Sequence, residues 1–345
     1  MQNTLHNLPI PLRHVGPLKI NYASDSFEVD VPLATYEVPL WPSVGRGARV
    51  TKLAGGISAV VLKECMTRSI LLEAESAEIA VKIANDLESN RCELEKQATQ
   101  SSRFLALQDW TLQIVGNLLF IRFAFTTGDA AGHNMATKAA EALQNWILQH
   151  YPELKYISIS GNYCADKKNS AVNSILGRGK YVIADVVIPR NICIKYLRAT
   201  PEQIANLNLK KNLIGSIVSG GVRTANAHFA NMLLAFYLAT GQDSANIVEG
   251  SQGITHAEAR NNDLYFSVTL PNIIVGTVGA SKNLDLVQQN LNNLGCLDLR
   301  STGENARRLA VIAAATVLCG ELSLLAAQAN PGELMRSHLA LERKK

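Results

Sequence analysis

The strongest constraint on the fold of this chain is a run of alternating strand-like and helix-like segments between residues 68 and 160. The predicted elements are, in chain order, a strand at 68–74, a helix at 76–98, strands at 110–115 and 118–127, a helix at 128–151 and a strand at 155–160. Gly116 and Asn117 separate the two middle strands, which indicates a hairpin, and Ser76 and Asp129 suit the caps of the two helices. The order β-α-β-β-α-β predicts a ferredoxin-like, split-βαβ unit.

The rest of the chain surrounds this unit in sequence, so we expect the unit to be an insertion in a larger domain. We place the small domain at residues 69–159 and the large domain at residues 1–68 and 160–345. A chain of 345 residues is long enough for two domains with a substantial buried core.

Outside the insertion, two apolar helices are predicted at residues 221–243 and 304–330. Gly241 suits the end of the first, and the sequence Asn330-Pro331-Gly332 ends the second. The most apolar run, Leu309 to Cys319, is far shorter than the ~20 residues that span a bilayer, so it predicts a buried helix. A strand followed by a glycine-rich turn is predicted at 264–280, and the tail could form a short helix.

Composition excludes several classes of protein. Hydrophobic residues make up 47% and charged residues 18%, which is typical of a globular chain, and a net charge of +4 gives little reason to expect nucleic-acid or membrane partners. The six cysteines are scattered, without a CxxC pair or a histidine cluster, which argues against a metal site and fits reduced thiols in a cytosol. The first residues lack the pattern of a signal peptide, so we expect a soluble, cytoplasmic protein.

Glycine-rich turns are candidate phosphate sites. No GxGxxG fingerprint follows a predicted strand. The segment "GDAAGHN" (128–134) follows a strand and opens a helix, and bare amides at a helix N-terminus bind anions well. The segment "GTVGASKN" (276–283) is a second turn of this kind. From spacing alone, an ordinary capped helix is the favoured explanation of the first turn, and the second turn has the same two explanations.

Polar residues in apolar surroundings are the other candidates. His228 and Asn231 are three residues apart and share a helix face, where they are either satisfied in the core or line a polar pocket. Asp243 follows that helix, where a carboxylate meets the negative helix end. Lys167 and Lys168 lie in "SGNYCADKKNSAVNSILGRGK" (160–180), which is either a solvated loop or a binding site for a negative group.

The segments "SGNYCADKKNSAVN" and "GRGKYVIADVVIP" resemble the central signature of the 3-hydroxy-3-methylglutaryl-coenzyme A (HMG-CoA) reductase family. Further motifs occur in the family's order between about residues 8 and 340. These are "VPLATYE", "CMTR", "SSRF", "GDAAGHNM", "KKNLIGS", "NAHFAN", "GQD", "GTVG", "GENARRLA", "GELSLLAA" and "RSHLA".

The resemblance implies an α+β fold: a large, mostly helical domain around a long central helix, with an inserted ferredoxin-like domain that binds the nicotinamide cofactor. It also implies dimers or multiples of dimers, with active sites shared between chains. The implied reaction reduces the thioester of HMG-CoA to mevalonate and free coenzyme A in two hydride transfers from NADPH, in the mevalonate pathway of isoprenoid biosynthesis. Negative charge develops on one oxygen in each step, so a fixed cation beside it would lower the barrier.

Residue roles are carried over by matched position. The implied catalytic residues are Lys167 (the cation), Asp243 (its hydrogen-bond partner), Glu37 (the acid at the carbonyl) and His338 (the acid for the departing thiolate). The implied substrate-binding residues are Arg46 and Arg49, for the coenzyme A phosphates, with Arg68, Ser160, Asp166, Lys168, Lys211, His228 and Asn231. The implied cofactor-binding residues are Ser102 and Arg103, for the 2′-phosphate, with Asp129, Ala131, Gly132, His133, Asn134, Val278 and Gly279.

Some positions depart from the family pattern. Two prolines and Trp41 follow Glu37, and Ala131 and His133 stand where methionine is common. Because only seven residues follow His338, we expect the class I-like, biosynthetic branch in a soluble form. An NAD-dependent enzyme that oxidises mevalonate, and a coenzyme A-binding protein with impaired catalysis, are the alternatives. RNA binding lacks a basic-aromatic sheet signature.

Overall fold

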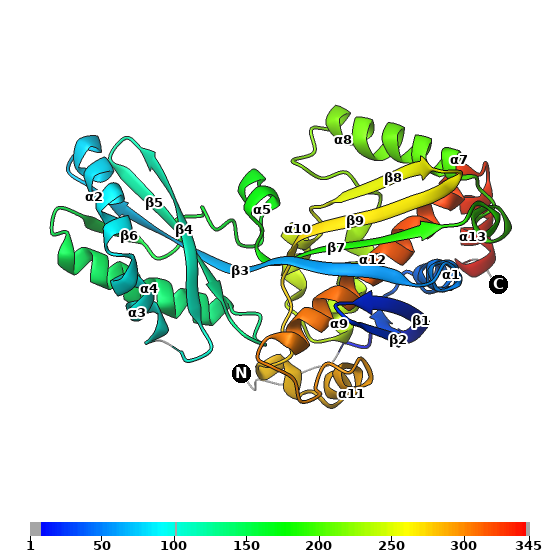
Figure 1. The fold of residues 1–345 in the computed structure, drawn as a ribbon, viewed down its shortest axis with the longest axis horizontal. Coiled ribbons are helices and arrows are strands. Elements are labelled where there is room, and N and C mark those ends of the chain that lie inside the picture. Colours follow the sequence, from blue (N-terminus) through cyan, green and yellow to red (C-terminus); the bar gives the residue numbers. More distant parts are fainter. Residues whose placement is uncertain (1–7, 101, 343–345) are drawn as a thin grey trace.

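The computed structural model describes residues 8–100 and 102–342; the side chains of Ser337, His338 and residues 340–342 lie outside this description. Figure 1 shows two lobes that share one long strand, β3 (Ile57–Glu73). The buried hydrophobic side chains accordingly form two clusters, one in each lobe. The fold is a mixed α and β structure built on a mixed sheet.

Nine strands make up the sheet. The other eight are β1 (Leu12–Tyr22), β2 (Asp25–Ala34), β4 (Ala106–Val115), β5 (Leu118–Thr126), β6 (Lys155–Ser158), β7 (Gly179–Ile188), β8 (Ile254–Arg260) and β9 (Asp263–Ile273). The main path runs β2-β1-β3-β7-β9-β8, in which β1 and β3 are parallel and the other neighbours antiparallel.

In the small lobe, the second half of β3 pairs with β5 and β6, and β5 pairs with β4, so the strand order is β4-β5-β3-β6. The predicted hairpin at Gly116 is confirmed, as is Ser76 as a helix cap. One predicted helix is wrong in detail, because residues 76–98 form two helices, α2 (Ala77–Ser89) and α3 (Arg91–Thr99), that break at Asn90.

The large lobe departs from the expectation of a mostly helical domain. Strands β1, β2, β7 and β8 were not predicted, yet together with β9 and the first half of β3 they form its main sheet. Along β9, which was predicted, eight of eleven residues are buried, whereas β7 alternates between buried and more exposed residues, as a half-buried strand does. Burial on both faces therefore does not account for the strands that were missed.

The remaining helices belong to both lobes: His133–His150 packs in the small lobe, and most of the others pack around the large-lobe sheet (Figure 1). They are α1 (Leu40–Leu53), α4 (His133–His150), α5 (Ala171–Leu176), α6 (Arg190–Ile192), α7 (Pro201–Leu207), α8 (Gly215–Val218), α9 (Phe229–Ala239), α10 (Ile247–Gly250), α11 (Asp285–Asn293), α12 (Glu304–Ala329) and α13 (Glu333–Glu342). Helix α9 is shorter than the predicted 221–243, but Gly241 adopts the left-handed conformation expected at its end.

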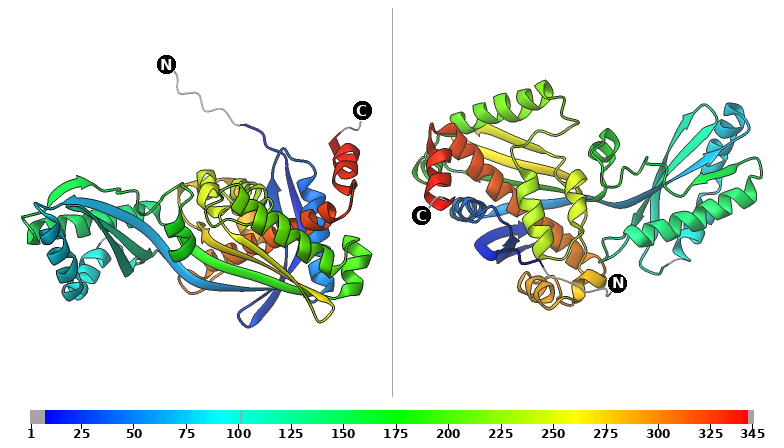
Figure 2. Two further views of the ribbon diagram at one scale, coloured as in Figure 1. Left: turned by 90° about the horizontal axis from the view of Figure 1, so that it is seen from above. Right: turned by 180° about the vertical axis from the view of Figure 1, so that it is seen from behind.

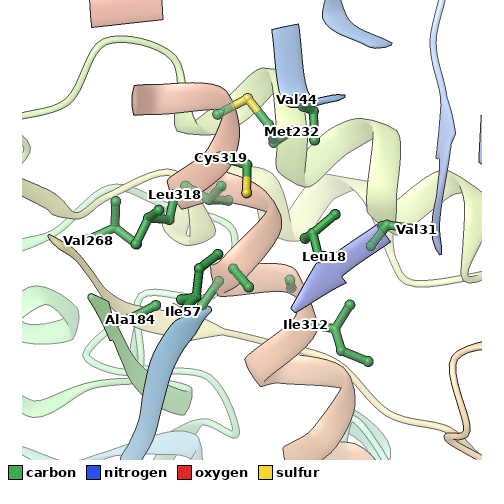
Figure 3. Close-up of a cluster of buried hydrophobic side chains, with 14 of the residues drawn as sticks. Leu18, Val31, Val44, Ile57, Ala184, Met232, Val268, Ile312, Leu318 and Cys319 are labelled. Atoms are coloured by element: carbon green, nitrogen blue, oxygen red, sulfur yellow. The ribbon is translucent and has the colours of Figure 1, made fainter. Parts of the chain in front are cut away.

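Helix α12 is the core of the large lobe. Its 26 residues are long and apolar enough to cross a membrane, but 94% of its most apolar window is buried inside the protein, as expected for a core helix. Figure 3 shows its residues Ile312, Leu318 and Cys319 among side chains from strands and from helices α1 and α9. A Cβ added at Gly47 of α1 would lie 2.1 Å from the carbonyl oxygen of Cys319, so only glycine permits this helix contact.

Candidate active site

The loop between β6 and α5 carries the predicted lysines, and it is tied to β3 where that strand passes between the lobes. The amide of Gly161 donates to the Ser69 carbonyl (3.1 Å), and the amide of Cys164 donates to the Ser69 hydroxyl (3.1 Å). Asn162, Ala165 and Lys167 have φ values of 59°, 46° and 54°. Three such non-glycine residues in one loop represent backbone strain that surrounding contacts must hold.

Lys167 and Asp243 meet in this structure. Nζ of Lys167 lies 2.8 Å from Oδ2 of Asp243, and their side chains are 42% and 43% exposed. The hydrogen bond to Asp243 raises the pKa of Lys167. Partial burial opposes ionisation of Asp243, but the hydrogen bonds from Lys167 and from the amide of Ala245, together with the charge of Lys167, lower the pKa of that carboxyl. The pair therefore presents a fully charged ammonium group at an open surface.

A buried ionic network holds the loop from below. Glu249, which is fully buried on α10, accepts a hydrogen bond from the backbone amide of Lys167 (3.1 Å) and from Nη1 of Arg178 (2.8 Å). Nη2 of Arg178 lies 3.0 Å from Oδ1 of Asp166. Sequence reasoning missed Arg178 and Glu249, because only their partners far along the chain give them a role.

The other residues predicted here cluster around the same loop. Arg68 is half-buried on β3, beside the Ser69 that binds the loop, and its Nε has no hydrogen-bond partner among the described residues. Ser160 is held by Ser158, whose hydroxyl accepts from the Ser160 amide at 3.0 Å. Lys168 is exposed, and its Nζ donates to the carbonyl of Asp166 (3.2 Å).

A second group of predicted residues lines a pocket of about 350 Å³ between α1, α9, α12 and α13. Glu37, Arg46, His228 and Asn231 all line it. Nε2 of His228 lies 3.0 Å from the carbonyl oxygen of Gly320, and Nδ1 lies 3.4 Å from Nδ2 of Asn231. Pro39 and Pro42 also line the pocket, so part of the altered segment after Glu37 forms its wall.

Glu321 organises this pocket from inside α12. Its fully buried carboxylate accepts hydrogen bonds from the amides of Ala227 (2.5 Å) and His228 (3.1 Å) and from the hydroxyl of Thr255 (2.9 Å). Lys211 lies nearby: burial lowers its pKa, while the charge of Glu321 opposes that shift. Sequence reasoning missed the role of Glu321 as well.

Arg46 and Arg49 are engaged within the chain. Nη1 of Arg46 lies 2.6 Å from Oε1 of Glu333, the first residue of α13, and Nε donates to the hydroxyl of Ser323 (3.0 Å). Arg49 lies over the ring of Tyr196, 4.9 Å from its centre. Figure 2 shows α13 beside α1 at the end of α12. His338 belongs to α13, but its side chain lies outside the described residues.

The two groups lie at opposite ends of α9. His228 precedes the helix and Asp243 follows it, and its 11 residues span about 16 Å. Figure 1 shows the same separation, with α5, which follows the lysine loop, between the lobes and α1 at the far end of the large lobe. One chain therefore brings Lys167 and Asp243 together but does not bring Glu37 to them.

The predicted cofactor turns lie side by side. Ala130 and Val278 form a parallel bridge, and the amide of Thr277 donates to the Asp129 carbonyl (2.8 Å). A Cβ at Gly276 would lie 2.3 Å from the amide nitrogen of Ala131, so the contact requires glycine. Val278, Gly279 and Asn134 are exposed, and space beside Gly279 is open. These bare, adjacent turns fit a phosphate-bearing dinucleotide.

Asp129 has a different cap role from the predicted one. It does not cap α4, whose cap is Gly132 in a left-handed conformation. Its carboxylate instead caps α12, accepting hydrogen bonds from the amides of Gly303 (2.9 Å) and Ala306 (3.0 Å). The prediction failed because the partner helix begins more than 170 residues later along the chain.

Ser102 and Arg103 flank the first cofactor turn. Ser102 accepts from the amide of Phe104 (3.2 Å), the exposed Arg103 lies over the Phe104 ring (4.7 Å), and Phe104 lies within 4 Å of where a Cβ of Gly128 would be. An exposed guanidinium beside a phosphate-binding turn suits a further phosphate.

His133 joins the cofactor turn to the lysine loop. Its Nε2 lies 4.0 Å from Oδ1 of Asp166. Burial, reinforced by the charge of Arg178, lowers the pKa of His133 to about 4, so the imidazole is neutral at pH 7. Among the described residues, no group of His, Cys, Asp and Glu side chains has the geometry of a metal site.

Comparison with known proteins now identifies the family. A family model described as hydroxymethylglutaryl-coenzyme A reductase matches residues 1–343. The chain belongs to the HMG-CoA reductase family. The HMG-CoA reductases of the archaea Pyrococcus abyssi and Aeropyrum pernix are each 43% identical to it; the matches cover 99% of this chain and 84% and 82% of those proteins.

Other HMG-CoA reductases extend the comparison. The enzyme of the fungus Phycomyces blakesleeanus is 42% identical over 99% of this chain, which spans 29% of that longer protein. The solved class II HMG-CoA reductase from Streptococcus pneumoniae, described as bound to NADPH in open conformations, superimposes with a TM-score of 0.76. That match covers 96% of this chain and 78% of the other at 21% identity, and shows a shared fold.

Proposed function

We propose that this protein is an HMG-CoA reductase that converts HMG-CoA to mevalonate and free coenzyme A in the mevalonate pathway. The observation that carries the proposal is the Lys167–Asp243 pair, 2.8 Å apart at an open surface next to the glycine-rich turns. Identity of 42–44% to archaeal and fungal reductases, against 21% to the class II structure, supports the class I-like branch.

NADPH would supply two hydrides, one for the thioester and one for the resulting aldehyde. In each step Lys167 stabilises the oxygen that gains negative charge. Asp243 holds its ammonium group, and the hydrogen bond that its backbone amide donates to the Glu249 carboxylate holds its backbone. Glu37 donates a proton to that oxygen, and His338 protonates the departing thiolate of coenzyme A.

The remaining residues bind the substrate. Arg68, Ser160, Asp166 and Lys168 on the loop side, and Lys211, His228 and Asn231 on the pocket side, hold the carboxylate and hydroxyl of the acyl group. Arg46 and Arg49 bind the coenzyme A phosphates. Since Arg46 contacts Glu333 in this structure, the phosphate replaces that carboxylate on binding.

The cofactor residues would divide their roles by position. The amides of Ala131, Gly132, His133 and Asn134, with Val278 and Gly279, approach the pyrophosphate, while Asp129 holds the first turn against α12. Ser102 and Arg103 bind the 2′-phosphate, which favours NADPH over NADH.

The two clusters of buried residues support a division into two domains. We place a ferredoxin-like cofactor domain at residues 69–159 and a substrate domain at 1–68 and 160–345. The strand order β4-β5-β3-β6 and the flanking helices support this assignment. A cytoplasmic location is proposed because all six cysteines are free thiols.

The protein would act as a homodimer or a higher homo-oligomer with shared active sites. Within one chain Glu37 lies in the pocket at one end of α9 and Lys167 lies at the other end of this helix, which is about 16 Å long, so a second copy would supply the missing half. Ile214, Ile217 and Val218 near α8 are 49%, 78% and 82% exposed, an apolar surface that a second copy would cover.

Mixing two inactive variants tests this sharing. Glu37→Gln and Lys167→Met subunits, unfolded and refolded together, should regain about a quarter of wild-type activity, because half of the dimers are mixed and each has one intact site. Each variant refolded alone is the control. No recovery in confirmed mixed dimers would contradict a shared site.

The activity itself is tested by mixing HMG-CoA with NADPH. We expect two NADPH oxidised for each coenzyme A released, and faster turnover with NADPH than with NADH. A preference for NADH with mevalonate and coenzyme A as substrates would favour the catabolic direction. Calorimetric binding of HMG-CoA without any turnover would favour a coenzyme A-binding protein with impaired catalysis.

A further inference from the structure

His133 has a place in the candidate site that its position at the start of α4 does not explain. Its Nε2 faces Oδ1 of Asp166 across 4.0 Å, between the first cofactor turn and the loop that carries Lys167. Both atoms are buried, and neither has a hydrogen-bond partner among the described residues. Oδ1 of Asp166 lies 3.0 Å from Arg178 but receives no well-aligned hydrogen bond from it.

Such atoms are costly to leave unpaired, so the gap indicates a missing partner. The separation exceeds the usual hydrogen-bond limit of about 3.2 Å, but one small group between the two atoms could lie within hydrogen-bond distance of both. Around the gap, Lys167 is paired with Asp243, and the one guanidinium of Arg178 lies against two carboxylates, Glu249 and Asp166. A ligand group that donates hydrogen bonds therefore suits the gap better than an anion.

The two facing atoms specify the chemistry of that group. Asp166 is an acceptor, and a neutral imidazole accepts at Nε2 when its proton is on Nδ1. Burial keeps the imidazole neutral, since it lowers the pKa of His133 to about 4. Two acceptors that face one point call for a donor with two N–H bonds, as in a primary amide.

We propose that His133 and Asp166 bind the carboxamide NH₂ of the nicotinamide ring, and that this pair positions the ring beside Lys167 and Asp243. The inference rests on the proposed cofactor. It assigns His133 a contact with the reactive end of NADP(H), in addition to the backbone contact expected of the turn. Asp166 thereby acts on the cofactor as well as on the loop.

The test compares NADP⁺ with its 3-acetylpyridine analogue, in which a methyl group replaces the NH₂. Calorimetry on the wild type should show about tenfold weaker binding of the analogue, since two acceptors lose their donor. In His133→Met that ratio should fall to about 2, mainly through weaker binding of NADP⁺. His133→Gln, which keeps an acceptor, should retain part of the discrimination.

Val278→Ala is the matched control, because Val278 lies on the neighbouring turn and is 53% exposed. It should shift both dissociation constants equally and leave their ratio unchanged. Equal ratios in the wild type and His133→Met would overturn the inference, and would show that a water or nothing fills the gap. If His133→Met fails to fold, an unchanged ratio in His133→Gln with a wild-type melting curve, or no preference for NADP⁺ in the wild type, also overturns it.

Binding is measured without HMG-CoA, so the two proposals fail separately. If the protein binds NADP⁺ with the expected discrimination but does not reduce HMG-CoA, the proposed His133 contact is supported and the proposed reductase activity is wrong. If the protein reduces HMG-CoA but His133→Met leaves the ratio of the two dissociation constants unchanged, the reductase activity is supported and the proposed His133 contact is wrong.

Discussion

The two ends of α9 are each built on one fully buried glutamate, and they differ in how its charge is compensated. Glu249, at the Lys167 end, accepts from the guanidinium of the equally buried Arg178. Glu321, at the pocket end, accepts its closest hydrogen bonds from neutral amides and a hydroxyl, with His228 Nε2 4.0 Å away. One end is thus held by an ionic network and the other by neutral donors.

The way in which each buried glutamate is compensated fits the kind of surface found at that end of α9. The Lys167 end has a strained loop and a charged pair that is open to solvent, so a rigid ionic base keeps an exposed charge in place. The pocket end is an enclosed space between helices, where packing sets the shape and Glu321 fixes the chain entering α9. Substitution of Lys167 at the first end should therefore affect the chemical step, and substitutions at the second end, apart from the proposed acid Glu37, should affect binding and shape.

The largest effect is expected at the exposed, Lys167 end of α9. Lys167→Met removes the cation beside the reacting oxygen and should lower kcat about 10³-fold, or ~4 kcal/mol, with little change in KM. Steady-state NADPH oxidation measures it, with Lys82→Met on the exposed face of α2 as the control. If kcat persisted, the Lys167 end would be a structural pair only.

Glu249→Gln tests the buried Glu249–Arg178 ion pair that supports the Lys167 loop. The substitution leaves the guanidinium of Arg178 buried without its closest carboxylate, and should reduce the free energy of unfolding by about 3 kcal/mol. Urea unfolding measures the loss. A double variant, Glu249→Gln with Arg178→Met, should recover part of the stability, because the uncompensated charge is then absent. Equal losses in the single and double variants would show that Glu249 does not act through Arg178.

The sequence predicted the local features on each side of this comparison but not the buried glutamates. The hairpin at Gly116, the Ser76 cap and the end of α12 at Asn330 were correct, because each depends on neighbouring residues. Glutamate is usually exposed, and the partner of Glu249 is 71 residues away, so nothing local marks it as buried. Strands β1, β2, β7 and β8 of the large lobe were also missed, although β9 was predicted.

The candidate site residues were predicted from matched motif positions and not from local patterns. Lys167 and Asp243 were proposed as a pair by matched position, and the structure brings them to 2.8 Å, although 76 residues of chain separate them. Position alone could not show that Arg46 contacts Glu333 or that Asp129 caps α12. A matched motif predicts which residues belong to the site. The contacts that those residues make within the chain depend on the three-dimensional packing.

Glu321→Gln tests the pocket end of α9, where neutral donors hold the buried carboxylate. The amide keeps one acceptor but introduces N–H donors facing the amides of Ala227 and His228, so the free energy of unfolding should fall by about 2 kcal/mol. The loss should be smaller than for Glu249→Gln, because no buried guanidinium loses its partner. Urea unfolding of both variants in one buffer compares them, and a larger loss for Glu321→Gln would reverse the proposed difference.

The smallest effect concerns His133, which adds a titrating group to the Lys167 end. Burial and the charge of Arg178 lower its pKa from 6.5 to about 4, although Asp166 and Asp243 oppose the shift. Between these values the unfolded chain binds a proton that the folded protein does not, so the free energy of unfolding falls as the pH falls. The loss attributable to His133 between pH 7 and pH 5.5 should be about 1 kcal/mol.

The measurement is the difference in urea unfolding between the wild type and His133→Met at the two pH values, since carboxylates titrate alike in both. His133→Met should lose less stability on acidification. His256→Met is the control, because it removes an exposed histidine on β8 whose Nε2 lies 3.9 Å from Oε2 of Glu258. Identical losses in wild type and His133→Met would mean that the imidazole is as free to accept a proton in the folded protein as in water. The Lys167 end would then be more open to solvent than its buried network implies, and the contrast with the pocket end would rest on Arg178 alone.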